Sequence, residues 1–120
     1  MYPGEPEGAM SDTQPTFACD LGALSAEERA QRSTLASRVA ARFREVQELP
    51  DGYAARLDDP AVVQDALDWL LLERRCCPFL RLDLCFEPSD GPVWLQFRGG
   101  PGTKEFLAAA GLKATAAKAR

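Results

Sequence analysis

The sequence predicts an α+β fold, a two-layer sandwich in which an antiparallel sheet built from two helix–hairpin units carries its helices on one face. Three observations lead to this prediction. First, two amphipathic segments carry helix-capping signals. Second, there are two pairs of runs with alternating apolar residues, and turn residues join the two runs of each pair. Third, these helices and hairpins alternate along the chain. That order is a short strand, then helix and hairpin twice, then a last helix.

The chain begins with a segment that does not have the composition of a folded domain. Residues 1–15 are rich in Pro, Gly and Glu, which predicts a disordered leader. Apolar side chains alternate over 16–21, as in a short strand. Ser25 and Glu28 have the spacing of a capping box, so a helix should begin there and run to about Phe43.

The first hairpin and the second helix follow. Residues 44–58 form two extended runs around Pro50-Asp51-Gly52, a sequence that favours a turn. Asp59 suits a helix N-cap and Pro60 the first helical position. The helix should end near the adjacent cysteines, because Pro78 disfavours helical geometry in the residue before it. Its expected buried stripe is Val63, Ala66, Leu67, Leu70 and Leu71.

A second hairpin is predicted from residues 79–87 and 93–99, joined by the turn sequence PSDGP. In its first strand the leucines share one face, whereas Arg81, Asp83 and Cys85 share the other. A carboxylate therefore flanks the Cys85 thiol.

The length of 120 residues fits one domain, which we expect to span residues 16–112. Its last element is a helix over 103–110, after a glycine-rich turn. The basic residues of 113–120 predict a frayed tail.

Composition excludes several classes of function. The net charge of −4 argues against a nucleic-acid surface. No apolar run approaches the roughly 20 residues that cross a bilayer, and the first residues lack the pattern of a signal peptide. We therefore expect a cytoplasmic protein whose thiols are reduced.

The cysteines are the strongest candidates for a functional site. The chain has 4 cysteines and no histidine, which excludes mixed Cys/His zinc sites within one chain. Cys76 and Cys77 are adjacent, unlike the spaced pairs of structural zinc sites. Thiolate-only sites suit soft ions such as Hg(II), Cu(I) or As(III). We predict a thiophilic metal site at Cys76 and Cys77, joined by Cys19 or Cys85.

Other interpretations of the same residues stay open. Free cysteines can be small buried core residues, as in an interaction protein whose cysteines only pack. The breaking helix should let both thiols of the pair turn outward, where Arg74 and Arg75 could offset the helix dipole. A thiol-dependent enzyme would use the cysteines as nucleophiles in redox chemistry, or in cleaving a carbon–metal bond with Asp83 as proton donor.

The run LERRCCPFLRLDLCFE, followed by GPVWLQFRGGPGTKEFL, resembles a family of small bacterial proteins with an E-R-x-C-C-P-F core. The resemblance covers about residues 17–107 and includes FACDLGALSAEER and VQELPDGYAARL. It implies soft-metal handling in heavy-metal resistance, mercury in particular, with Cys76 and Cys77 as the centre. Cys19 falls in the F-x-C segment of the family, whereas Cys85 lies outside its motif.

The sequence thus predicts a cytoplasmic protein that binds an ion of the Hg(II) or Cu(I) type through a vicinal cysteine pair. It would buffer the ion or transfer it by thiolate exchange. The expected partners are the metal ion, a protein that donates or accepts it, and a second copy of the chain.

Overall fold

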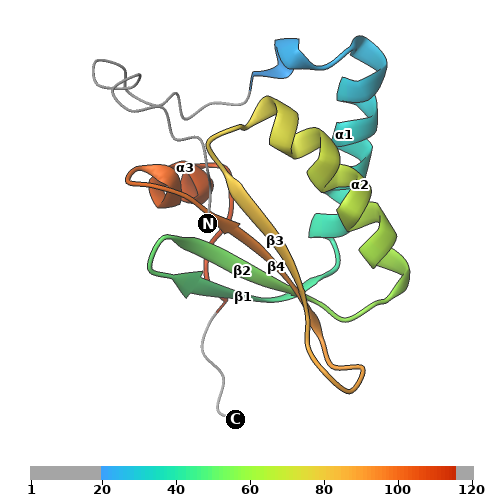
Figure 1. Cartoon of the computed structure of the whole chain (residues 1–120), viewed down its shortest axis with the longest axis vertical. Helices are drawn as coiled ribbons and strands as arrows, with labels where there is room; N and C mark the ends of the chain where they lie inside the picture. Colours follow the sequence, from blue (N-terminus) through green and yellow to red (C-terminus); the bar gives the residue numbers. More distant parts are fainter. Residues whose placement is uncertain (1–19, 116–120) are drawn as a thin grey trace, which may run out of the picture.

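The computed structural model describes residues 20–115, and from the first α-helix onward its helices and strands follow the predicted order (Figure 1). The end of the predicted first strand is wrong, because Leu21 begins a short 3-10 helix. Residues 16–19 of the predicted first strand lie outside this part, as do the leader 1–15 and the end of the tail, 116–120. Within it, no helix combines the length and the apolar character needed to cross a membrane. The elements are η1 (Leu21–Ala23), α1 (Ala26–Ala40), β1 (Phe43–Leu49), β2 (Gly52–Leu57), α2 (Ala61–Cys76), β3 (Arg81–Phe86), β4 (Val93–Arg98) and α3 (Thr103–Ala109).

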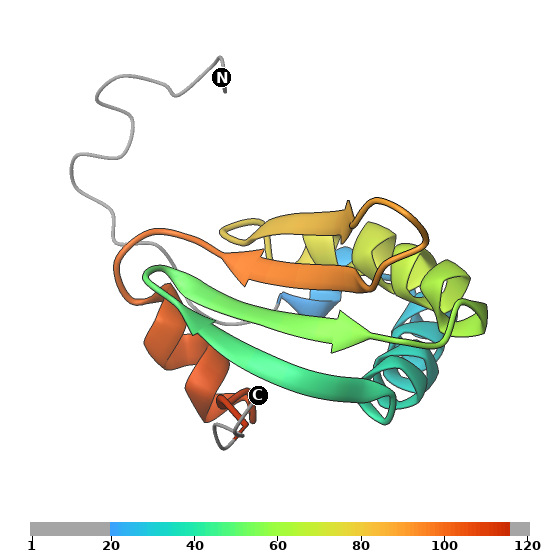
Figure 2. The same cartoon turned by 90° about the horizontal axis from the view of Figure 1, so that it is seen from below.

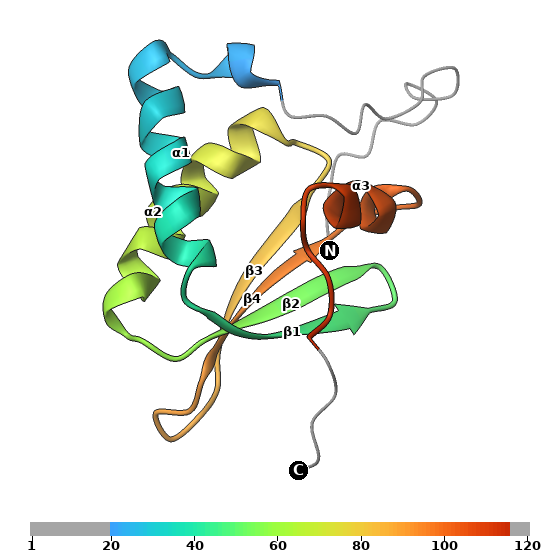
Figure 3. The ribbon, with the colours of Figure 1, turned by 180° about the vertical axis from the view of Figure 1, so that it is seen from behind.

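The sheet has the strand order β1-β2-β4-β3, and all its pairs are antiparallel. Val46 lies opposite Ala55, Ala55 opposite Leu95, and Leu95 opposite Leu84, so these apolar residues share one face. All three helices cover that face, α1 and α2 at one end and α3 at the other (Figures 2 and 3). The predicted α+β sandwich with helices on one face is confirmed.

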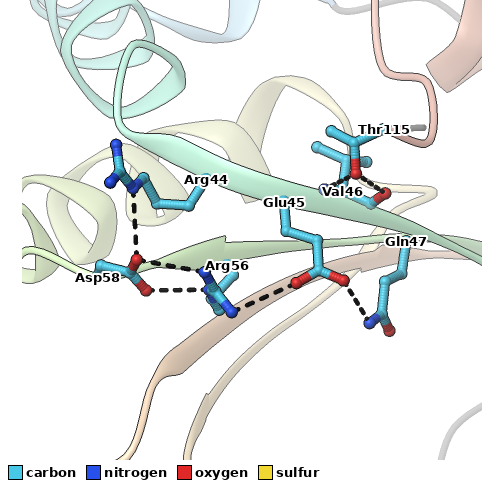
Figure 4. Close-up of polar contacts among 7 residues, drawn as sticks. All are labelled: Arg44, Glu45, Val46, Gln47, Arg56, Asp58 and Thr115. Atoms are coloured by element: carbon cyan, nitrogen blue, oxygen red, sulfur yellow. Dashed lines mark hydrogen bonds and ion pairs between the residues drawn. The ribbon is translucent and has the colours of Figure 1, made fainter. Parts of the chain in front are cut away.

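The other face of the sheet is polar. Arg56 Nε lies 3.0 Å from Asp58 Oδ1, and Arg56 Nη1 lies 3.4 Å from Glu45 Oε1 (Figure 4). Gln47 donates to Glu45 Oε2 at 2.9 Å on the same face. These residues alternate with apolar ones along β1 and β2, which gives a core-facing side and an outer side.

Helix α1 begins as predicted and ends earlier. The Ser25 hydroxyl accepts from the Glu28 amide at 3.1 Å, and the Glu28 carboxylate accepts from the Ser25 amide at 2.9 Å, which completes the capping box. The predicted extension of the helix to Phe43 is wrong. Phe43 opens β1 opposite Leu57, and its ring packs against the core from the sheet.

The buried face of α2 differs from the predicted stripe. Ala66 and Leu70 are buried, but Leu67 and Leu71 are 43% and 51% exposed. The helix packs against both α1 and the sheet, where Trp69 contacts Phe97 with ring centroids 5.8 Å apart. This second contact rotates the buried face toward Trp69. The buried residues are Val62, Ala66, Trp69, Leu70, Leu72, Glu73 and Cys76.

An exposed ion pair joins the start of α1 to the end of α2. Arg75 Nη1 lies 2.8 Å from Glu28 Oε2, and Arg75 Nη2 lies 3.2 Å from Oε1. This bidentate contact with Arg75, helped by the hydrogen bond from the Ser25 backbone, lowers the pKa of Glu28 from 4.5 to about 2.

The lowered pKa of Glu28 predicts an acid-sensitive link between the two helices. A carboxylate with a depressed pKa in the folded state contributes stability above its unfolded value of 4.5, and this contribution is lost as the pH falls toward 2. Urea unfolding between pH 5 and pH 2.5 should show a shallower loss of stability in Glu28→Gln and Arg75→Gln than in the wild type. Identical pH profiles in all three proteins would contradict the assignment.

Candidate metal centre

The cysteine pair lies where α2 stops. Cys76 is the last residue of the helix, and Cys77 is its C-cap with φ −127° and ψ 68°. The Cys77 amide still donates to the Glu73 carbonyl at 2.8 Å, but Pro78 follows and the helix cannot continue. The predicted end of the helix at the cysteine pair is confirmed.

Both side chains of the pair point into the core. Cys76 and Cys77 are each 0% exposed, and their Sγ atoms lie 3.8 Å apart. The expectation that both thiols turn outward is therefore wrong. The segment before α1 folds over the end of α2, where the Asp20 amide donates to the Cys76 carbonyl at 2.6 Å.

A third ligand type, not foreseen from the sequence, lies beside the pair. Glu73 Oε2 is 3.3 Å from Cys77 Sγ, and the ligand atoms of Glu73, Cys76 and Cys77 all lie within 4.8 Å of one another. All three residues are buried. Glu73, Cys76 and Cys77 have the spacing i, i+3, i+4, which places side chains on one face of a helix. This spacing could have identified Glu73 from the sequence.

Arg32 of α1 holds the Glu73 carboxylate in place. Arg32 Nε lies 2.9 Å from Glu73 Oε1, and Arg32 Nη2 lies 3.1 Å from Oε2. This pair is nearly enclosed, because the side chains are only 21% and 8% exposed. The two charges compensate each other inside the core, as a buried carboxylate requires.

The same surroundings set the protonation of Cys76. Burial raises the pKa of the Cys76 thiol, the Glu73 carboxylate raises it further, and the Arg32 guanidinium opposes both effects. Cys76 is therefore a protonated thiol at neutral pH, which makes it a weak nucleophile. Arg75, expected to offset the helix dipole near the thiols, instead binds Glu28 and the Ala23 carbonyl.

The cysteines differ in redox state. Cys77 is disulfide-bonded, whereas Cys76 and Cys85 are free. Within residues 20–115, neither of the other two cysteines supplies the second sulfur, since both are free. Cys19, the fourth cysteine of the sequence, lies outside the described residues.

Cys85 is not brought to the pair. It lies opposite Trp94 on the polar face of the sheet, whereas the neighbouring Leu84 faces the core that holds Cys76. Asp83 shares the outer face with Cys85. The sheet therefore separates Asp83 from Cys76, so the geometry gives no support to carbon–metal cleavage with Asp83 as its acid.

The site combines two sulfur atoms with one carboxylate among buried residues of the core, and such a group could hold a metal ion. Its low exposure and protonated Cys76 thiol are poorly suited to nucleophilic catalysis, which needs an accessible thiolate.

No protein-family model, no curated protein and no solved structure matches this chain.

Proposed function

We propose that the reduced protein binds one divalent thiophilic metal ion of the Hg(II) type through the thiolates of Cys76 and Cys77. It would buffer the ion or transfer it by thiolate exchange, one ligand at a time. The proposal rests mainly on one observation, the buried vicinal pair with Glu73 inside a 4.8 Å group. The ERRCCPF run also resembles the E-R-x-C-C-P-F core of a small bacterial family, and this resemblance implies the same role.

The charges around the pair favour a divalent ion over Cu(I). With both thiols protonated, Glu73 and Arg32 cancel each other. Exchange of two thiol protons for one divalent cation keeps the site neutral, whereas Cu(I) would leave one uncompensated negative charge in the core. Uncompensated buried charge is strongly destabilising.

The sulfur spacing favours a bent arrangement of ligands. Two sulfurs at about 2.3 Å from one ion lie about 3.8 Å apart at a tetrahedral angle and about 4.6 Å apart in a linear complex. In the disulfide-bonded form of Cys77, the Sγ atoms of Cys76 and Cys77 already lie 3.8 Å apart. Glu73, with Oε2 at 3.3 Å from Cys77 Sγ, is placed to act as a third, weaker ligand.

Binding requires the Cys77 disulfide to be opened first. Two equivalents of a small thiol such as glutathione supply two electrons and two protons and leave as their own disulfide, and the protein S–S bond becomes two S–H groups. The other sulfur of this disulfide comes from neither Cys76 nor Cys85, because both are free. The metal-binding form then belongs in a reducing compartment such as the cytoplasm.

The ion needs a path to the buried sulfurs. The segment from Asp20 to Ala23 covers the end of α2 and is attached there by the Asp20–Cys76 bond and by the 3.1 Å bond from Arg75 to the Ala23 carbonyl. No residue of η1 is buried. Local opening of this segment would expose the pair at small cost, and an incoming thiolate could then replace the ligands in turn.

Titration of the reduced protein with Hg(II), Cd(II) and Cu(I), followed by thiolate-to-metal absorption, tests the proposal. We expect one Hg(II) per chain and a fall in affinity of more than about 100-fold in Cys76→Ser, beyond what outer-shell changes cost. Cys85→Ser, altered on the opposite face, is the matched control and should bind as the wild type does.

The redox assignment has its own readout. Peptide mapping of the oxidised protein should show Cys77 in a disulfide, and Hg(II) binding should return on reduction. Equal affinity of Cys76→Ser and Cys85→Ser, or full binding by the oxidised protein, would refute a metal site at the pair.

A further inference from the structure

The two edges of the sheet differ in how their backbone is bonded. Along β1, the Thr115 amide donates to the Val46 carbonyl at 2.9 Å, and the Val46 amide donates to Thr115 Oγ1 at 3.4 Å (Figure 4). Strand β3 forms the other edge (Figure 1). Among residues 20–115, no segment bonds to the outward backbone groups of β3. An uncovered edge is a template for pairing with another strand.

The backbone groups that β3 directs away from β4 belong to its even-numbered residues. The Glu87 amide donates to the Pro92 carbonyl at 3.1 Å, which continues the β3–β4 ladder. Bonding alternates along an antiparallel strand, so the odd-numbered residues of β3 bond to β4. Leu82, Leu84 and Phe86 therefore present their amides and carbonyls to the outside.

An exposed apolar surface accompanies this edge. Phe86 is 64% exposed, and it lines the same groove as Val63 at the start of α2. Leu67 and Leu71 continue from Val63 at intervals of four residues and are 43% and 51% exposed. The helix lies over the β3 side of the sheet (Figure 2). Large exposed apolar side chains in one region mark an interaction surface.

We propose that two copies of this chain associate through antiparallel pairing of their β3 strands, with Leu84 opposite Leu84 of the second copy. Leu82 then lies opposite Phe86 of the second copy, which covers the exposed ring. On the outer face, Arg81, which already forms an ion pair with Asp83 at 3.3 Å, lies opposite Glu87 of the second copy. Twofold symmetry repeats each of these contacts, so the edge is complementary to itself in shape and charge.

Neighbouring registers are less favourable. Residues of β3 whose backbone groups point away from β4 must pair with the same kind of residue in the second copy. The register can therefore change only in steps that keep even-numbered residues opposite even-numbered residues. Centring on Asp83 places two carboxylates directly opposite each other, which is destabilising. Centring on Leu82 places Phe86 opposite Pro78, which has no amide to donate. Of these three registers, the one centred on Leu84 pairs the whole of β3 without a charge or donor conflict.

Sedimentation equilibrium of the full reduced chain tests the pairing. We expect a monomer–dimer equilibrium whose dissociation constant rises by about 100-fold in Phe86→Glu and in Leu71→Glu, because each places a charge at an apolar contact. Leu21→Glu changes a leucine of similar exposure, 41%, on η1 rather than on α2 or β3, and should leave the constant unchanged. Arg81→Glu should weaken the dimer, and the charge swap Arg81→Glu/Glu87→Arg should restore it.

Hydrogen exchange identifies the occupant of the edge. A dimer that dissociates on dilution, with loss of protection at Leu82, Leu84 and Phe86, supports the proposal. A wild type that is monomeric at every concentration overturns it. So does protection of those amides in the monomer, which would assign the edge to the chain's own residues. If the dimer persists in Phe86→Glu, the proposed apolar contact surface is wrong. If the charge swap does not restore association, the proposed register centred on Leu84 is wrong.

Discussion

Replacement of Gly52 by alanine should lower the free energy of unfolding by about 3 kcal/mol, at the upper end of the usual cost of overpacking. A Cβ at this position would lie 1.9 Å from the Phe97 carbonyl oxygen and 2.9 Å from the Arg98 Cα. Both atoms are backbone, so no side chain can move aside. Relief requires β2 and β4 to separate at the end of their ladder, where Gly52 lies opposite Arg98.

Thermal unfolding measures this effect directly. For a domain of 60–100 residues, a loss of about 3 kcal/mol corresponds to a fall in Tm of roughly 12–24 °C. Gly100→Ala is the matched control, because a Cβ there meets nothing within 4 Å. A Gly52→Ala protein as stable as Gly100→Ala would show that the two strands can separate at this point without cost.

Local signals were sufficient to predict most of the architecture. Ser25 and Glu28 start α1 through contacts within one helical turn, and Pro78 ends α2 through its effect on the residue before it. The alternation along β3 correctly assigned Cys85 to the outer face. Each of these features depends on near neighbours in the chain, which a single sequence contains in full.

Features that depend on packing between elements were not predictable in this way. Leu67 and Leu71 were expected to be buried, but α2 contacts both α1 and the sheet, so its buried face is turned toward Trp69. The positions of apolar residues along a helix do not reveal how many other helices or strands it packs against.

The site illustrates the same limit. Cys76 and Cys77 were identified from their adjacency, whereas Glu73 was not among the predicted site residues. Its burial depends on Arg32, 41 residues earlier in the chain, whose guanidinium binds both carboxylate oxygens. Nothing in the local sequence of α2 indicates that partner.

Removal of Arg32 should therefore be costly. In Arg32→Ala the Glu73 carboxylate, which is 6% exposed as a residue, loses the cation that compensates it. Removing one partner of a buried ion pair costs about 3–5 kcal/mol of stability. We expect a loss of about 3 kcal/mol, because the Arg32 side chain is still 21% exposed. Urea unfolding of the reduced protein measures the loss.

Two further variants separate charge from packing. Arg38→Ala breaks the exposed pair with Asp65, whose side chains are 58% and 23% exposed, and should cost about 0–1 kcal/mol. The double variant Arg32→Met/Glu73→Leu replaces both charges by apolar groups and should recover most of the stability lost in Arg32→Ala. If the double variant is as unstable as Arg32→Ala, the Arg32 stem and its packing, rather than the uncompensated Glu73 charge, account for the effect.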